Sequence, residues 1–223
     1  MIFNSFTYLL FLALVVVLYW SLSQRLRLIL LLSASVVFYG FWNFYFVPLM
    51  FLSIVVDYTA SIMIHRNKKH LIRKALLWLS LLTNFLLLGF FKYYYFFIEN
   101  AIFAGQVIGI DWDPMLINVV LPIGISFYTF QSVSYTIDVY RRQIQPISDF
   151  ILFSSYVTFF PQLVAGPILR AGEIIWQLEK RPTFMPNMIK YGIARILGGI
   201  ALKVLLADNI ASSVNLGFEA DPS

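Results

Sequence analysis

The stretch from Leu28 to Val56 reads LILLLSASVVFYGFWNFYFVPLMFLSIVV and carries no charged side chain over 29 residues. A transmembrane helix needs about 20 apolar residues, so this stretch is too long for one untilted span. Pro48 follows an aromatic cluster at 41–46. Aromatic side chains gather at membrane interfaces, and proline is favoured in the first turn of a helix. We therefore predict two spans, at about 28–46 and 48–64, with a turn between them.

The rest of the chain is similarly apolar. Of its 223 residues 60% are hydrophobic and 12% are charged, whereas soluble domains carry about 25% charge. Further spans are predicted at about 6–20, 75–98, 116–138 and 188–207. The predicted fold is all-α: a polytopic transmembrane helical bundle of about six spans, forming a single transmembrane domain over 1–223.

The distribution of the basic residues predicts the orientation of these spans. Lys and Arg favour cytoplasmic loops. Loops 21–27, 65–74 and 139–149 hold two, five and two of them, whereas loops 43–47 and 99–115 hold none. The basic loops are therefore predicted to be cytoplasmic and the amino terminus non-cytoplasmic. This topology accounts for the net charge of +5. The expected partner is therefore the lipid bilayer, and no nucleic-acid partner is expected.

Residues 150–169 break the alternation. They are uncharged for 20 positions, yet basic residues flank them on both sides. Pro161 and the pair Gly166-Pro167 interrupt helical hydrogen bonding. Irregular backbone at membrane depth is tolerated only inside protein or beside a wet cavity. We predict a re-entrant hairpin that enters from the cytoplasmic side.

The span 116–138 is the richest in polar residues, which are costly within a membrane. On a helix they fall on two nearly opposite faces. One face holds Gln131, Ser134 and Asp138, and the other holds Thr129, Ser132 and Thr136. Two interpretations remain open: hydrogen bonds between helices, or the lining of a water-filled cavity.

Asp57 and Lys92 could form an ion pair, but their depths differ. At 1.5 Å per residue, Asp57 lies about 10 Å and Lys92 about 26 Å from the cytoplasmic ends of their spans. Asn84, about 14 Å deep, is the better partner for Asp57. Lys92 is expected to extend toward the outer interface among aromatic residues.

Soluble-enzyme motifs are missing from the sequence. Position 128 is Tyr, so Gly124-Ile-Ser126 lacks the second glycine of a nucleophile elbow. His65 and His70 lie in a cationic loop and are expected to be solvated. With no cysteine and no zinc spacing or nucleotide fingerprint, no metal site and no bound cofactor are predicted.

Two motifs resemble the membrane-bound O-acyltransferase family. One is LPIGISFYTFQ at 121–131 followed by SYTIDVYR at 134–141, and the other is FFPQLVAGPI at 159–168 followed by Arg170. The resemblance covers essentially the whole chain and is greatest for the bacterial, alginate-type branch. Nine residues are then candidates for lining a tunnel or its donor side: Gln131, Ser134, Asp138, Tyr140, Pro161, Gln162, Gly166, Pro167 and Arg170.

The resemblance also implies an activity. Members of the family move an acyl group from a cytoplasmic thioester, such as acetyl-CoA, toward an acceptor across the membrane. A buried histidine acts as general base. In alginate-type systems, periplasmic or secreted partner proteins then modify a polysaccharide, which implies the bacterial inner membrane.

The chain departs from the family in its general base, because neither His65 nor His70 occupies the position that matches the family's buried histidine. The histidine is expected downstream, so the chain is interpreted as the amino-terminal part, an incomplete half, of the family's fold. No catalytic residue is assigned within it, and it is expected to be inactive alone. A transporter component and a non-catalytic scaffold remain the alternatives.

Overall fold

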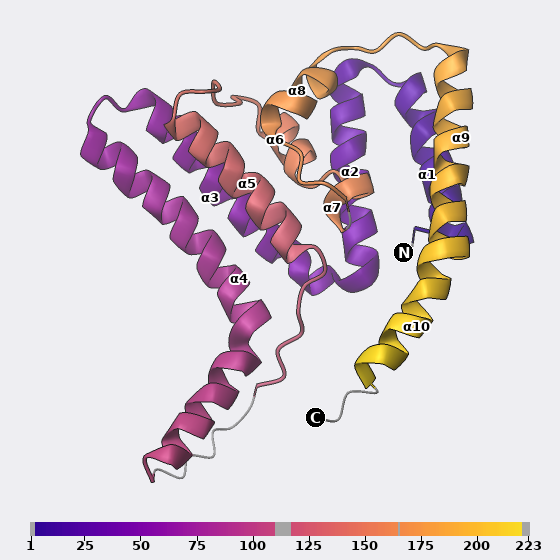
Figure 1. Ribbon diagram of the computed structural model, residues 1–223. Helices are drawn as coiled ribbons and strands as arrows, with labels where there is room; N and C mark the ends of the chain where they lie inside the picture. Colours follow the sequence, from indigo (N-terminus) through magenta and orange to yellow (C-terminus); the bar gives the residue numbers. More distant parts are fainter. Residues whose placement is uncertain (1–2, 110–116, 165, 220–223) are drawn as a thin grey trace. The chain divides into compact units, whose positions relative to one another are not determined.

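The computed structural model describes residues 3–109, 117–164 and 166–219, and within these ranges it contains helices and no strand (Figure 1). The helices are α1 (Phe6–Ser21), α2 (Gln24–Asn43), α3 (Val47–Arg66), α4 (His70–Val107), α5 (Ile125–Tyr140), α6 (Phe150–Val157), α7 (Phe160–Leu163), α8 (Ala171–Glu179), α9 (Pro186–Leu202) and α10 (Asp208–Glu219). The predicted all-α class is confirmed.

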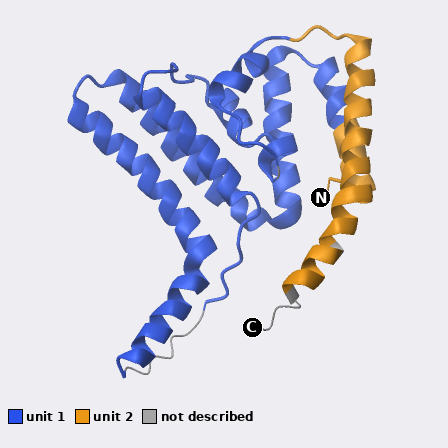
Figure 2. Ribbon diagram, viewed as in Figure 1, with its two compact units in different colours: residues 1, 14–181 blue, residues 2–13, 182–223 orange. Residues whose placement is uncertain are grey.

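The chain divides into two compact units (Figure 2). One comprises Met1 and residues 14–181, and therefore holds α2 to α8. The other comprises 2–13 and 182–223 and includes α9 and α10. The candidate site described below lies entirely within the first unit.

Helices α2 and α3 are separated where the sequence predicts it. A 3₁₀ turn, η1 (Phe44–Phe46), joins them, and Pro48 lies in the first turn of α3. The Asn43 side chain accepts a hydrogen bond from the backbone N–H of Tyr45 (3.0 Å), which helps to end α2. The two helices then run in opposite directions (Figure 1).

Helix α4 buries polar residues and exposes apolar ones. Its only buried residues are Ser80, Asn84 and Leu88, spaced four apart on one face, and this face packs against α3 and α5. Large apolar side chains such as Leu86 (68% exposed) cover the rest of the helix. A soluble amphipathic helix has the opposite pattern, so the exposed surface suits a lipid environment.

Two stretches are long and apolar enough to cross a membrane: Gln24–Arg66, which holds α2 and α3 with the η1 turn between them, and His70–Val107, which is α4. The apolar helices Phe6–Ser21 and Phe150–Leu163 are shorter. These stretches point to a membrane protein, and the number of about six crossings stays a prediction.

The helices differ in extent from two of the predicted spans. The fifth was placed at 116–138; position 116 lies outside the described residues, 117–122 are not helical, and α5 begins only at Ile125. Pro122 and a left-handed Gly124 (φ 75°) delay the helix. The last span was expected to end near 207, but a π-helical turn, Lys203–Ala207, continues the helix into α10.

Candidate functional site

Helices α6, α7 and α8 form a hairpin. The Asp149 side chain caps α6 by accepting from the backbone N–H groups of Ile151 (2.8 Å) and Leu152 (3.3 Å). Helix α6 ends at Val157, one turn follows as α7 with Pro161 in its first turn, and the chain then returns to α8. The proline therefore breaks the segment where the sequence predicts it.

Both ends of this hairpin contact the same end of α2. Arg25 forms an ion pair with Asp149 at the start of α6. Its neighbour Gln24 donates through Nε2 to the carbonyl oxygens of Leu178 (2.5 Å) and Glu179 (3.2 Å) at the end of α8. The segment thus returns to the end of the bundle at which it enters, which is the geometry that a re-entrant hairpin requires.

The tip of the hairpin is joined to α5 by two glutamines. Gln162 Nε2 donates to Gln131 Oε1 (2.8 Å), and Gln131 Nε2 donates to the backbone carbonyl of Tyr156 (2.7 Å). Both glutamines are buried. A buried amide costs free energy unless it is hydrogen-bonded, so these bonds stabilise the docked tip. On the other side of α7, the backbone N–H of Phe160 donates to Ser35 Oγ of α2 (3.1 Å).

Gly124 lets the tip approach α5 closely. A Cβ atom at this position would lie 2.4 Å from the carbonyl oxygen of Leu163. The backbone is also left-handed there, with φ 75°, a conformation that glycine adopts without strain. Glycine is therefore required at the start of α5 for two reasons: its left-handed backbone conformation and the close approach of the Leu163 carbonyl.

The second polar face of α5 is also bonded to protein. Ser132 donates to the Asp57 carboxylate of α3, and Thr136 Oγ1 donates to the backbone carbonyl of Ser132 (3.2 Å). Asn84 Nδ2 reaches both carboxylate oxygens of Asp57 at 2.9 Å, which confirms the predicted partner. The predicted hydrogen bonds between helices are therefore present at Gln131 and Ser132, and the lining of a water-filled cavity stays a prediction.

Lys92 takes no part in this cluster. Its Nζ lies 5.5 Å from the centre of the Tyr93 ring, in the aromatic stretch of α4. The predicted aromatic surroundings of Lys92 are confirmed.

The remaining candidate residues do not join the hydrogen bonds between the two glutamine side chains. Ser134 donates to the Gln131 carbonyl (2.8 Å) and Asp138 is half-buried. Tyr140 contacts the start of α4, where its hydroxyl lies 3.3 Å from His70 Nε2 and its carbonyl accepts from Arg73. The candidates on the return segment of the hairpin are exposed: Gly166, Pro167 and Arg170.

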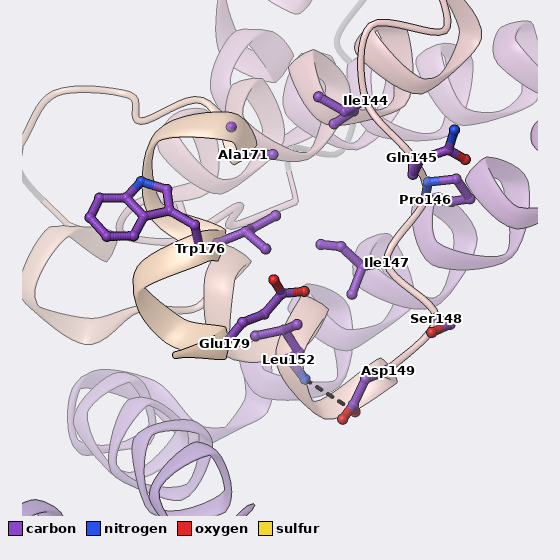
Figure 3. A pocket seen from close by; sticks show the side chains of 12 residues that line it. Ile144, Gln145, Pro146, Ile147, Ser148, Asp149, Leu152, Ala171, Trp176 and Glu179 are labelled. Carbon is purple, nitrogen blue, oxygen red and sulfur yellow. Dashed lines mark hydrogen bonds between the residues drawn. The ribbon is translucent and has the colours of Figure 1, made fainter. Parts of the chain in front are cut away.

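A cavity of about 350 Å³ lies at the base of the hairpin, between residues 144–149 and α8 (Figure 3). Ile147, Leu152 and Trp176 contribute apolar side chains, and Asp149 and Glu179 contribute carboxylates. Within the described part of the chain, its lining includes no Lys or Arg and none of the nine candidate residues.

Sequence reasoning did not identify Ser35, Tyr156 or Leu163 as parts of this site. Tyr156 and Leu163 act through backbone carbonyls, which any residue type provides. Both histidines, His65 and His70, are exposed, as predicted, and His70 lies beside the candidate residue Tyr140. Among the residues that the structure describes, no group of three or more His, Cys, Asp or Glu side chains could hold a metal ion.

The amino-acid sequence has close relatives among bacterial proteins. A protein of Azotobacter vinelandii named "Probable alginate O-acetylase AlgI" is 36% identical over 95% of this chain and 42% of its own length. The protein of the same name in Pseudomonas aeruginosa is 36% identical over 95% of this chain and 41% of its own length. A peptidoglycan O-acetyltransferase of Helicobacter pylori is 31% identical over 85% of this chain and 40% of its own length.

The chain thus spans about two fifths of the length of the curated relatives that it matches. No family model and no solved structure matches it. The similarity nevertheless extends over nearly the whole chain and includes both motifs around the glutamine contact. Over nearly its whole length the chain is thus similar to a part of these O-acetyltransferases, which confirms the resemblance of its motifs to the membrane-bound O-acyltransferases.

Proposed function

We propose that this chain is the membrane-embedded part of an O-acetyltransferase that transfers acetyl groups to an exported polysaccharide. The observation that carries the proposal is the similarity over 95% of the chain to relatives named as alginate O-acetylases. A relative named as a peptidoglycan O-acetyltransferase supports the same reaction on another polymer. In both cases the acceptor is a hydroxyl group, and the product is an ester.

The proposed donor is acetyl-CoA or a similar thioester on the cytoplasmic side. The acceptor oxygen attacks the thioester carbonyl, a C–O bond forms, the C–S bond breaks, and the hydroxyl proton passes through a general base to the departing thiolate. Such a base must be positioned at the reacting hydroxyl. Because His65 and His70 are exposed, neither is placed for this role. We expect the 223 residues expressed alone to transfer no acetyl group.

The hairpin 150–170 is proposed to form the donor side of the site. Its docked tip closes against α5, and its return segment is exposed at Gly166, Pro167 and Arg170. We propose that the protein lies in the bacterial inner membrane and that periplasmic or secreted partner proteins complete the modification of the polysaccharide.

The activity is tested by deleting the gene in its host and measuring ester-linked acetate on exported polysaccharides. The proposal requires a loss that the intact gene restores. A vesicle assay with radiolabelled acetyl-CoA then tests the donor. An unchanged acetyl content on every exported polymer would refute the proposal and favour a transporter or scaffold.

The orientation is tested with single cysteines, which are unambiguous because the native chain has none. Cysteines at Asn67 and Gln106 should react with a membrane-impermeant thiol reagent from opposite faces. Cysteines at Ser148 and Gln177 should react from the same face, since the hairpin returns to its starting end. Reaction of the cysteines at Asn67 and Gln106 from one face would contradict the topology, and opposite reaction of those at Ser148 and Gln177 would contradict re-entry.

A further inference from the structure

Among the residues of the first unit that the structure describes, the most deeply buried charged side chain is that of Asp57, which is 0% exposed. Its Oδ1 accepts from Ser80 Oγ and Asn84 Nδ2, and its Oδ2 accepts from Asn84 Nδ2 and Ser132 Oγ. The two ion pairs found within the described ranges lie elsewhere. Neutral donors from α4 and α5 thus surround the anion on α3, and charge-assisted hydrogen bonds of this kind are stronger than neutral ones.

The bond to Ser132 restrains the rotation of α5. Ser132 follows Gln131, and consecutive residues of an α-helix point about 100° apart. Ser132 is held by Asp57 on one side, and Gln131 holds the hairpin through Gln162 and the Tyr156 carbonyl on the other. If the bond from Ser132 to Asp57 breaks and α5 rotates, Gln131 rotates with it and moves away from Gln162 and the Tyr156 carbonyl.

Helix α3 holds the entry of the hairpin through the residue that follows Asp57. The Tyr58 hydroxyl donates to the backbone carbonyl of Ser148 (2.5 Å). The Tyr58 ring lies 5.2 Å from the ring of Phe150 and 5.8 Å from that of Phe153. Adjacent residues of α3 therefore contact α5 and the first turn of the hairpin.

From these contacts we propose that Asp57 is a positioning residue, which fixes the rotation of α5 and thereby keeps the hairpin tip docked. The effect on acetyl transfer rests on the proposed function, whereas the effect on the hairpin does not. The carboxylate acts through Ser132 and Gln131 and takes no part in the chemistry itself.

The first test measures docking of the tip without any assay of activity. A cysteine replaces Leu163, which is 1% exposed in α7, and reacts slowly with a maleimide while the tip is docked. Asp57→Asn keeps the shape of the side chain but removes its charge and replaces one acceptor oxygen by an N–H donor, to which the Asn84 amide nitrogen cannot donate. We expect the reaction of Leu163→Cys to accelerate on the order of tenfold, because a buried charge-assisted bond is lost.

A cysteine at Ile64, buried on α3, is the control for global unfolding and should remain slow. Rescue comes from the exchange Asp57→Asn with Asn84→Asp, which returns a carboxylate to the same cluster. Ser53 Oγ already donates to Asn84 Oδ1, so a carboxylate at position 84 keeps that bond and gains the amide introduced at position 57 as a donor. A role in filling space alone would not produce such rescue.

The proposal requires fast reaction at Leu163 with slow reaction at Ile64 in Asp57→Asn, and recovery of slow reaction at Leu163 in the exchanged pair. Slow reaction at Leu163 in Asp57→Asn, equal acceleration at both cysteines, or failure of the exchange to restore docking would overturn it. In the active O-acetyltransferase the acetyl content should follow the labelling. Acetyl transfer that is absent even with wild-type Asp57 would count against the proposed function and leave the labelling result intact.

Discussion

Substitution of Gly124 by alanine tests the contact between α5 and the hairpin tip. An L-residue in the left-handed region costs about 1–2 kcal/mol. The new Cβ would lie 2.4 Å from the Leu163 carbonyl oxygen, so the tip must retreat, and overpacking of this kind costs about 1–3 kcal/mol. Alanine also restricts the unfolded chain, which offsets about 0.4–1 kcal/mol. A net loss of about 3 kcal/mol is expected from these terms.

For a chain of this length, a loss of about 3 kcal/mol corresponds to a fall in melting temperature of about 6–12 °C. The assay is thermal unfolding of the detergent-purified protein, together with maleimide reaction of Leu163→Cys. Gly89→Ala is the matched control, because nothing lies within 4 Å of a Cβ there and alanine favours a helix interior by up to about 1 kcal/mol. If Gly124→Ala melts within about 2 °C of wild type, by the same scaling, while the tip stays protected, the close approach is wrong.

Two further predictions concern charged residues. Asp149→Ala removes both the cap of α6 and the ion pair with Arg25, so it should lower the free energy of unfolding by about 1–2 kcal/mol. Arg25→Ala loses only a partly exposed pair and should cost less than about 1 kcal/mol; equal losses in thermal unfolding would contradict the capping role. In the active O-acetyltransferase, Asp138→Ala and Arg170→Ala should lower the acetyl content of the polymer, whereas unimpaired transfer by both folded variants would assign these residues a structural role.

The depth of polar residues could be predicted from the sequence, but their full set of partners could not. Counting 1.5 Å per residue placed Asn84 beside Asp57 and kept Lys92 away from it, and both outcomes agree with the structure. Ser80 and Ser132 complete the cluster. They were not foreseen as partners of Asp57, because depth along an axis does not give the rotation of one helix relative to another.

The ends of the helices were predictable where a proline interrupts the helical hydrogen bonds and were less predictable elsewhere. Pro48 and Pro161 marked the turn before α3 and the break between α6 and α7. Residues 117–121 were assigned to the beginning of the fifth span because all of them except Asn118 are apolar. Pro122 and Gly124 determine the outcome, and α5 is left with 16 residues, about 24 Å, which is shorter than the bilayer core of about 30 Å.

The nine residues singled out from the motifs include two groups that differ in burial and in the contacts that they make. Gln131 and Gln162 are buried and bonded to each other, so they hold the hairpin against α5. Gly166, Pro167 and Arg170 are exposed on the return segment, where a donor could reach them. Under the proposed function, the motif around Gln162 thus contains a docked tip, followed by an exposed return segment that the donor reaches. Changes at the glutamines should then act first on stability, and changes at Arg170 should act first on transfer.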